Sequence, residues 1–303
     1  MLFEKVAIEP DLLSSDELVY LLHHNFGWFD GRFVADLPKN WIDLSRKIMH
    51  TLPDGIKKKK LESLLQIQRL PTCRLNTNLN NYASWLDLID SAKNNNEIPI
   101  VLCRNPRQEK GWFGEADLDK YLEDSKKRVG SLDIRGMKAD QVITALDIFL
   151  EANKQIALIN PDQWLLAQTF DNRELFKKMF SRWHTYGGVR FLVIRSKRSN
   201  REAEVLDRWD REINDLQKYL SNIGYVKDFK IIAVNDDADR LHDRYLLGNR
   251  FGLKLGYGLE ISHTKSHPWT MMQQSEYVAQ QRQFLQLDIR DKYPDHTCWV
   301  FRK

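Results

Sequence analysis

The chain has 303 residues, of which 42% are hydrophobic and 11% aromatic. That is enough for one large packed domain or two of ordinary size, and it excludes a globally disordered chain. The formal net charge is only +4 at pH 7, so an anionic partner such as nucleic acid or an anionic lipid surface is permitted but not required. Cys73, Cys103 and Cys298 lie far apart and form no C-x-x-C pair, which argues against a disulfide framework or a zinc knuckle.

The few, widely separated cysteines are typical of a reducing cytoplasm. Residues 1–5 lack the basic and apolar regions of a signal peptide, and no apolar run approaches the length of a membrane span. Together with the widely separated cysteines, these features predict a cytoplasmic protein without a transmembrane segment.

Residues 1–135 are predicted to form a mainly helical α+β domain of unknown role. Ser15 precedes an apolar-periodic run and has the character of an N-cap. Residues 41–50 and 117–128 also carry helical spacing, whereas the apolar run 98–104 indicates a buried strand. Four consecutive lysines at 57–60 are interpreted as a solvated turn at a helix start, with a phosphate-contacting patch as the alternative. This half contains no catalytic signature.

A domain boundary is expected at 130–136, where two glycines flank a polar stretch. The second domain, residues 136–303, alternates short apolar strands with helices of twelve to twenty residues. Strands are predicted at 156–159, 189–194, 229–234 and 244–247. This alternation is typical of an α/β sandwich with a largely parallel or mixed sheet.

The last of these strands begins at a candidate site, His242-Asp243-Arg244. Residues two apart in a strand project from the same face, so His242 and Arg244 are expected to act together. An imidazole can serve as nucleophile or proton donor, and a guanidinium can hold phosphate oxygens. The sequence therefore predicts a site for a phosphate-bearing ligand. The alternative is a structural turn in which Arg244 pairs with a carboxylate among residues 236–239.

Further basic residues are expected to line the same cleft. Arg195, Lys197 and Arg198 follow a predicted strand, at the edge where α/β sheets bind ligands, with a solvated loop as the alternative. His263 and Lys265 form an H-x-K pair just past the return strand that contains Lys254. The pair is assigned a supporting role, since such a pair also arises by chance. No spacing of ligand residues indicates a metal or another cofactor.

With these motifs in view, residues 140–285, roughly, resemble the phospholipase D-like superfamily. The likeness is carried by the βαβαβ order, by His242-Asp243-Arg244 and by the glycine-containing return strand 251–260. The family motif is H-x-K-x4-D followed by a glycine-rich turn. The resemblance implies that His242 is the covalent nucleophile, that Arg244 stands in the lysine position and that Asn249 stands in the aspartate position. Leu259 replaces the family asparagine.

An H-D-R followed by G-x-G-L-E is similar also to the phospholipase D-like carboxyl-terminal domains of some proteins with MIT domains, which bind phospholipid. The resemblance implies a metal-independent phosphodiesterase or nuclease of the kind found in bacterial defence systems and mobile elements. Nucleic acid is the favoured substrate, and the second catalytic histidine would come from the mate in a homodimer. The alternative is a non-catalytic module that binds anionic phospholipid head groups or a protein.

Overall fold

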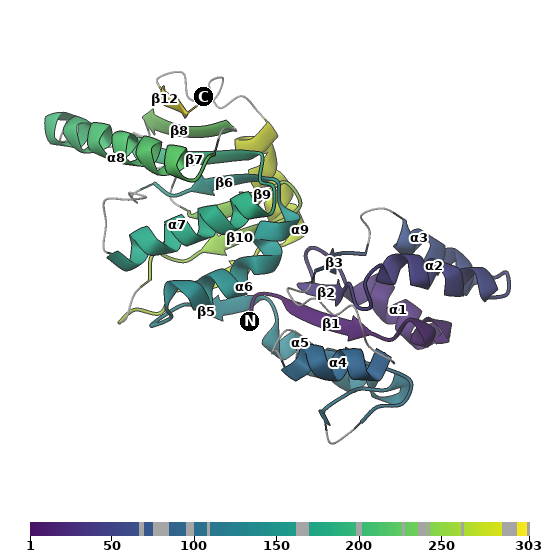
Figure 1. Cartoon of the computed structure of the whole chain (residues 1–303). Helices are drawn as coiled ribbons and strands as arrows, with labels where there is room; N and C mark the ends of the chain where they lie inside the picture. The colour runs from purple at the N-terminus through teal and green to yellow at the C-terminus, as the bar shows by residue number, and fades with distance from the viewer. Residues whose placement is uncertain are drawn as a thin grey trace. The chain divides into compact units, whose positions relative to one another are not determined.

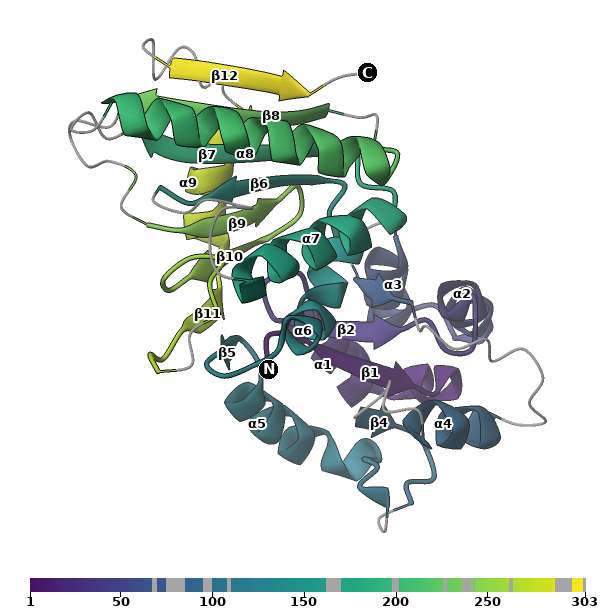
Figure 2. The ribbon, with the colours of Figure 1, turned by 60° about the vertical axis from the view of Figure 1, so that its left-hand side comes forward.

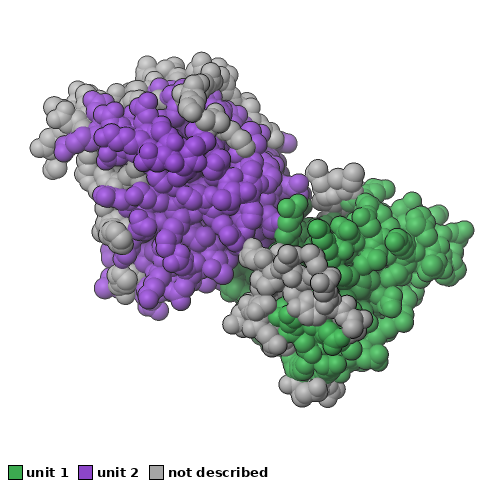
Figure 3. Space-filling model, viewed as in Figure 1, with its two compact units in different colours: residues 1–130 green, residues 131–303 purple. Residues whose placement is uncertain are grey.

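Two units make up the chain, Met1–Gly130 and Ser131–Lys303, and Figure 3 colours them separately. The computed structural model describes residues 1–66, 70–74, 85–94, 100–107, 110–161, 170–197, 202–225, 228–235, 241, 243–261, 264–286 and 296–301. Both units are mixed α/β. Among the described residues, no helix combines the length and apolar character needed to cross a bilayer.

Unit 1 is built on a parallel sheet of four strands in the order β3-β2-β1-β4 among its described residues. Its elements are β1 (Glu4–Ile8), α1 (Asp16–Asn25), β2 (Arg32–Ala35), α2 (Trp41–Thr51), α3 (Ile56–Leu65), β3 (Thr72–Cys73), α4 (Trp85–Asn94), β4 (Ile100–Leu102) and α5 (Leu118–Arg128), with short 3-10 helices at Pro10–Ser14 and Glu115–Asp117.

Apolar side chains of the unit 1 strands are buried on both sides of the sheet. Val6 and Ile8 belong to a core formed with α1, α2, α3 and α5, whereas Ala7 belongs to a second core with α4. A sheet covered on both faces is characteristic of parallel strands. The prediction for residues 1–135 included a strand only at 98–104, so β1 and β2 were missed. β1 and β2 are too short for periodicity to separate them from helix.

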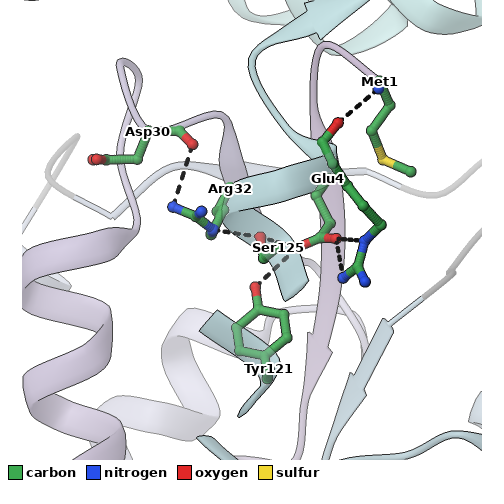
Figure 4. A network of polar contacts seen from close by, with 7 residues as sticks. Met1, Glu4, Asp30, Arg32, Tyr121 and Ser125 are labelled. Carbon is green, nitrogen blue, oxygen red and sulfur yellow. Dashed lines mark hydrogen bonds and ion pairs between the residues drawn. The ribbon is translucent and has the colours of Figure 1, made fainter. Parts of the chain in front are cut away.

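A buried carboxylate ties α5 to the amino ends of β1 and β2 (Figure 4). Glu4 is fully buried and accepts hydrogen bonds from Tyr121 (3.0 Å), Ser125 (2.7 Å) and Arg128 (2.9 and 3.3 Å). Arg32, 5% exposed, donates in turn to the Ser125 hydroxyl at 2.6 Å. Burial, followed by the charge of Glu4, raises the pKa of Tyr121 far above its ordinary value. We assign this network a structural role.

Unit 2 contains a mixed sheet of eight strands in the order β12-β8-β7-β6-β9-β10-β11-β5, counted over the described residues. Its elements are β5 (Ser131–Asp133), α6 (Ala139–Ala152), β6 (Gln155–Ile159), α7 (Phe170–Thr185), β7 (Arg190–Lys197), α8 (Glu202–Asn222), β8 (Asp228–Asn235), β9 (Tyr245–Gly248), β10 (Gly252–Leu255), β11 (Pro268–Met271), α9 (Gln274–Gln281), a π-helical turn Arg282–Gln286 and β12 (His296–Phe301).

The centre of this sheet is parallel and its flanks are antiparallel. β6, β7 and β8 run parallel, while β9, β10, β11 and β5 on one side and β12 on the other pair antiparallel with their neighbours. Helices α6, α7 and α8 cover one face and α9 lies on the other (Figure 1 and Figure 2). The predicted α/β class and the mixed sheet are confirmed.

Candidate functional site

Alternating strand directions bring four chain segments to one edge of the unit 2 sheet. The carboxyl end of β6 meets the start of β9, because these strands are antiparallel. β10 runs antiparallel to β9 and β11 antiparallel to β10, so the end of β10 and the start of β11 reach the same edge. β6 is also the strand at which the sheet changes from parallel to antiparallel pairing. Ligands of α/β sheets commonly bind outside carboxyl strand ends at such a position.

Arg244 lies at this edge beside the residue that follows β6. Ile159 pairs with Tyr245, so Asn160 and Arg244 are adjacent across the two strands, and the Arg244 carbonyl accepts the amide of Leu255 at 2.8 Å. Asn160 is 1% exposed. Asn160 was not among the site residues predicted from the sequence. Its position directly after an apolar strand is the signal that would have identified it.

The glycine turn after β10 closes over this pair. Gly258 has φ +96°, and a Cβ there would lie 2.8 Å from the Asn160 amide nitrogen and 3.2 Å from Arg244 Cδ. Only glycine combines that backbone conformation with so close an approach. The turn therefore places main-chain groups against the Asn160 and Arg244 side chains.

The amino-terminal turn of α7 is anchored to the same segment. Asn172 is buried, and its side-chain oxygen accepts the amide of Ile261 at 2.9 Å. Helix amino termini carry partial positive charge and bind phosphate readily. The start of α7 thus lies against Ile261, three residues after Gly258.

A histidine that the sequence analysis did not select lies at the start of β11. His267 is 2% exposed, and its Nδ1 is buried without a hydrogen-bond partner among the described residues. Burial lowers the pKa of His267, and the carboxylates of Glu260 and Asp133 oppose that shift. The Asp133 carboxylate accepts the His267 amide at 2.9 Å, which fixes the backbone beneath the imidazole.

Lys254 lies on the opposite face of the sheet from Arg244. It pairs directly with Tyr245, one position from Arg244, and strand side chains alternate between faces. Its ammonium is 3.6 Å from Asp243 and 3.8 Å from Glu276 of α9. The structure therefore does not bring Lys254 together with Arg244.

Asn249 lies at the far end of β9, in the turn to β10. Its side-chain oxygen accepts the amides of Lys154 (2.9 Å) and Gln155 (3.1 Å). It lies five positions after Arg244 in the chain, a span of about 16 Å when extended. Asn249 thus ties the start of β6 to the turn rather than facing the edge that holds Arg244.

Arg195 forms a buried ion pair inside unit 2. It is 2% exposed, and its two terminal nitrogens donate to Glu212 of α8 at 2.6 and 3.3 Å. We assign it a structural role. Lys265, in contrast, is exposed, with its ammonium 5.9 Å from the Tyr257 ring centre.

The side chains of the other predicted site residues lie outside the described part of the structure. Lys197 ends β7, but its side chain is outside the described part of the structure. Three others lie outside the described residues altogether: His242, Arg198 and His263. The carboxylates suggested as structural partners of Arg244, at 236–239, lie outside them as well.

Metal-ligating side chains and surface grooves are the other features of the described residues that bear on a site. No group of three or more His, Cys, Asp or Glu side chains among them is arranged to hold a metal ion. A groove of about 540 Å³ opens in unit 1 between α1, α3 and α5, with Tyr20, Lys57 and Asp119 on its walls. Its walls combine apolar side chains with side chains of both charges. They indicate a particular ligand less clearly than the edge around Arg244 does.

Neither the models of known protein families nor the sequences of curated proteins contain a match to the chain.

Proposed function

We propose that unit 2 is a phosphodiester-directed module of phospholipase D-like type, with Arg244 as the clamp on the phosphate. One observation carries the proposal. Arg244 stands beside buried Asn160 at the carboxyl end of β6, under the close backbone approach of Gly258. A guanidinium, an amide side chain and an adjacent helix amino terminus form a set suited to phosphate oxygens.

Nucleic acid is the substrate we favour, and His242 is the nucleophile in this proposal. The imidazole attacks phosphorus and the P–O bond to the leaving group breaks. That oxygen takes a proton from a second histidine, which the dimer mate supplies. Water then gives a proton back to that second histidine and attacks phosphorus, and the P–N bond of the phosphohistidine breaks, which returns a phosphate monoester and the neutral His242 imidazole. Arg244 offsets the charge that develops on the phosphoryl oxygens, with bidentate geometry in place of lysine's point charge.

A second candidate function, a non-catalytic binder of anionic phospholipid head groups or of a protein, is favoured by the placement of Asn249. Its side chain is used to join β6 to the β9–β10 turn, so it does not replace the family aspartate in the site. The edge also carries carboxylates such as Glu260 beside its cations. We therefore expect affinity to come from directed contacts, with a modest dependence on salt.

Cleavage and binding are measured together to test the proposal. The full chain is incubated in EDTA with labelled single- and double-stranded DNA and RNA, and binding is measured in parallel with oligonucleotides and with phosphatidylserine vesicles. We expect Arg244→Ala to weaken binding about 10- to 150-fold, the equivalent of one lost charge-assisted hydrogen bond. Lys254→Ala is the matched control on the opposite face and should change binding less than about threefold.

The His242→Ala variant separates the two functions. EDTA-resistant cleavage that disappears in this variant supports the nuclease, and a twofold dimer by light scattering should accompany it. Binding that depends on Arg244 without any cleavage supports the binder. Equal effects of the Arg244 and Lys254 substitutions would show that the edge of β6 is not the site.

A further inference from the structure

An exposed aromatic ring stands immediately beside the proposed phosphate site. Tyr257 lies in the turn between Gly256 and Gly258 and is 52% exposed. Large aromatic side chains elsewhere in unit 2, such as Phe251 and Trp269, are fully buried. A single exposed ring is common on protein surfaces, so the groups around Tyr257 matter more than its exposure.

The turn holds this ring in a defined place. The Gly256 amide donates to the Pro268 carbonyl at 3.1 Å, and the Trp269 indole donates to the Gly258 carbonyl at 3.2 Å. The ring centre of Tyr257 is 4.6 Å from that of buried His267. A ring fixed from both sides of the turn requires little further ordering when a ligand binds.

The ring is also coupled in space to the phosphate clamp and to a cation. Gly258, the next residue, passes so close to Asn160 and Arg244 that an added Cβ would lie 2.8 Å from the Asn160 amide nitrogen and 3.2 Å from Arg244 Cδ. The Lys265 ammonium lies 5.9 Å from the Tyr257 ring centre. A phosphate held at Arg244 therefore lies against Gly258, whose neighbour Tyr257 supplies an aromatic ring, and the Lys265 ammonium lies beside that ring.

We propose that Tyr257 is a stacking platform for a nucleobase, so that the site takes single-stranded nucleic acid. This inference rests on the proposed function and specifies its ligand. Sites for single strands combine cations along the backbone with aromatic rings on which bases stack. A phospholipid head group supplies the phosphate but no planar ring for Tyr257, and a duplex keeps its base faces covered. The chemistry of the turn thus favours an unpaired strand.

An abasic strand provides the most direct test. Binding of the full chain to a fluorescein-labelled oligothymidylate is measured by anisotropy, beside an abasic oligonucleotide of the same length. Tyr257→Ala should raise the Kd for oligothymidylate about 5- to 150-fold, the range seen when one stacked base loses its platform. The same variant should leave the Kd for the abasic strand unchanged within about twofold. Tyr257→Phe keeps the ring and should bind oligothymidylate like the wild type.

Two controls make the outcome decisive. Tyr20→Ala removes a tyrosine of similar exposure, 58%, from unit 1 and should have no effect. If Arg244→Ala weakens both strands while Tyr257→Ala weakens neither, the phosphate site stands and the stacking inference fails. If no variant changes binding, or if only phosphatidylserine vesicles bind, nucleic acid is not the ligand and the inference is overturned with the favoured substrate.

Discussion

Neutralising Glu4 is expected to lower the free energy of unfolding of unit 1 by more than an ordinary surface substitution does. The carboxylate is fully buried and accepts from three side chains, with Arg128 as its direct ionic partner. Removing one member of a buried pair costs about 3–5 kcal/mol, because the other charge is left without compensation. The Arg128 side chain is 35% exposed and can regain water, which places the expected cost of Glu4→Gln near the lower value, about 3 kcal/mol.

Amide hydrogen exchange can measure this loss in unit 1 by itself. Mass spectrometry of peptides from β1 and α5 should show exchange about 150-fold faster in Glu4→Gln, since each 1.4 kcal/mol is about a factor of ten. Tyr121→Phe removes a single donor and should cost about 1 kcal/mol. The control is Glu62→Gln, at an exposed position of α3, expected within about 0.5 kcal/mol of the wild type. Exchange in Glu4→Gln that matches the control would refute the structural role of the network.

Three further predictions concern unit 2. Arg195→Ala strands a buried carboxylate and should lower the free energy of unfolding by about 3–5 kcal/mol, without the oligonucleotide Kd changing in fully folded protein; a weaker Kd there would restore a binding role. Asn249→Ala should cost about 1–2 kcal/mol in urea unfolding through two lost hydrogen bonds, and an unchanged midpoint would contradict it. Burial lowers the pKa of His267 below 6.5, so the unfolded chain binds a proton that the folded chain rejects. The free energy of unfolding therefore falls as pH drops below about 6.5. The difference in the free energy of unfolding between the wild type and His267→Gln should shrink in acid. A difference that stays constant between about pH 7.5 and pH 5 would contradict this assignment.

Local sequence pattern was sufficient for much of unit 2. The strands predicted at 156–159 and 229–234 correspond to β6 and β8, because each is an apolar run bounded by polar residues. The predicted cap at Ser15 is present as well, with its hydroxyl accepting the Leu18 amide at 3.1 Å. These features depend on neighbours within a few residues, which is the information a single sequence holds.

The sheet of unit 1 depends on partners far away in the chain. β1 and β2 each begin with a charged residue, Glu4 and Arg32, and charged residues are rarely buried unless paired. The groups that satisfy Glu4 belong to α5, more than 100 residues later. A local pattern therefore favours an exposed segment where the fold buries a strand.

Only part of the candidate site could be predicted from the sequence, and the reason is related. Strand alternation alone puts Lys254 on either face of the sheet, and the choice is made by its register against Tyr245. Arg195 follows an apolar run, and its partner Glu212 comes 17 residues later on α8. Neither pairing is visible before the strands and helices are assembled.

Asn249 also affects the site without touching a ligand, because it helps to fix the register of β9. A slip of one residue would turn every side chain of β9 to the other face, and Arg244 would then lie on the side of α9. Two contacts oppose that slip. Asn249 binds the first amides of β6, and Gly248 passes so close to Asn153 that an added Cβ would lie 2.1 Å from it. The turn at one end of β9 thus determines which face of the sheet receives the guanidinium at the other.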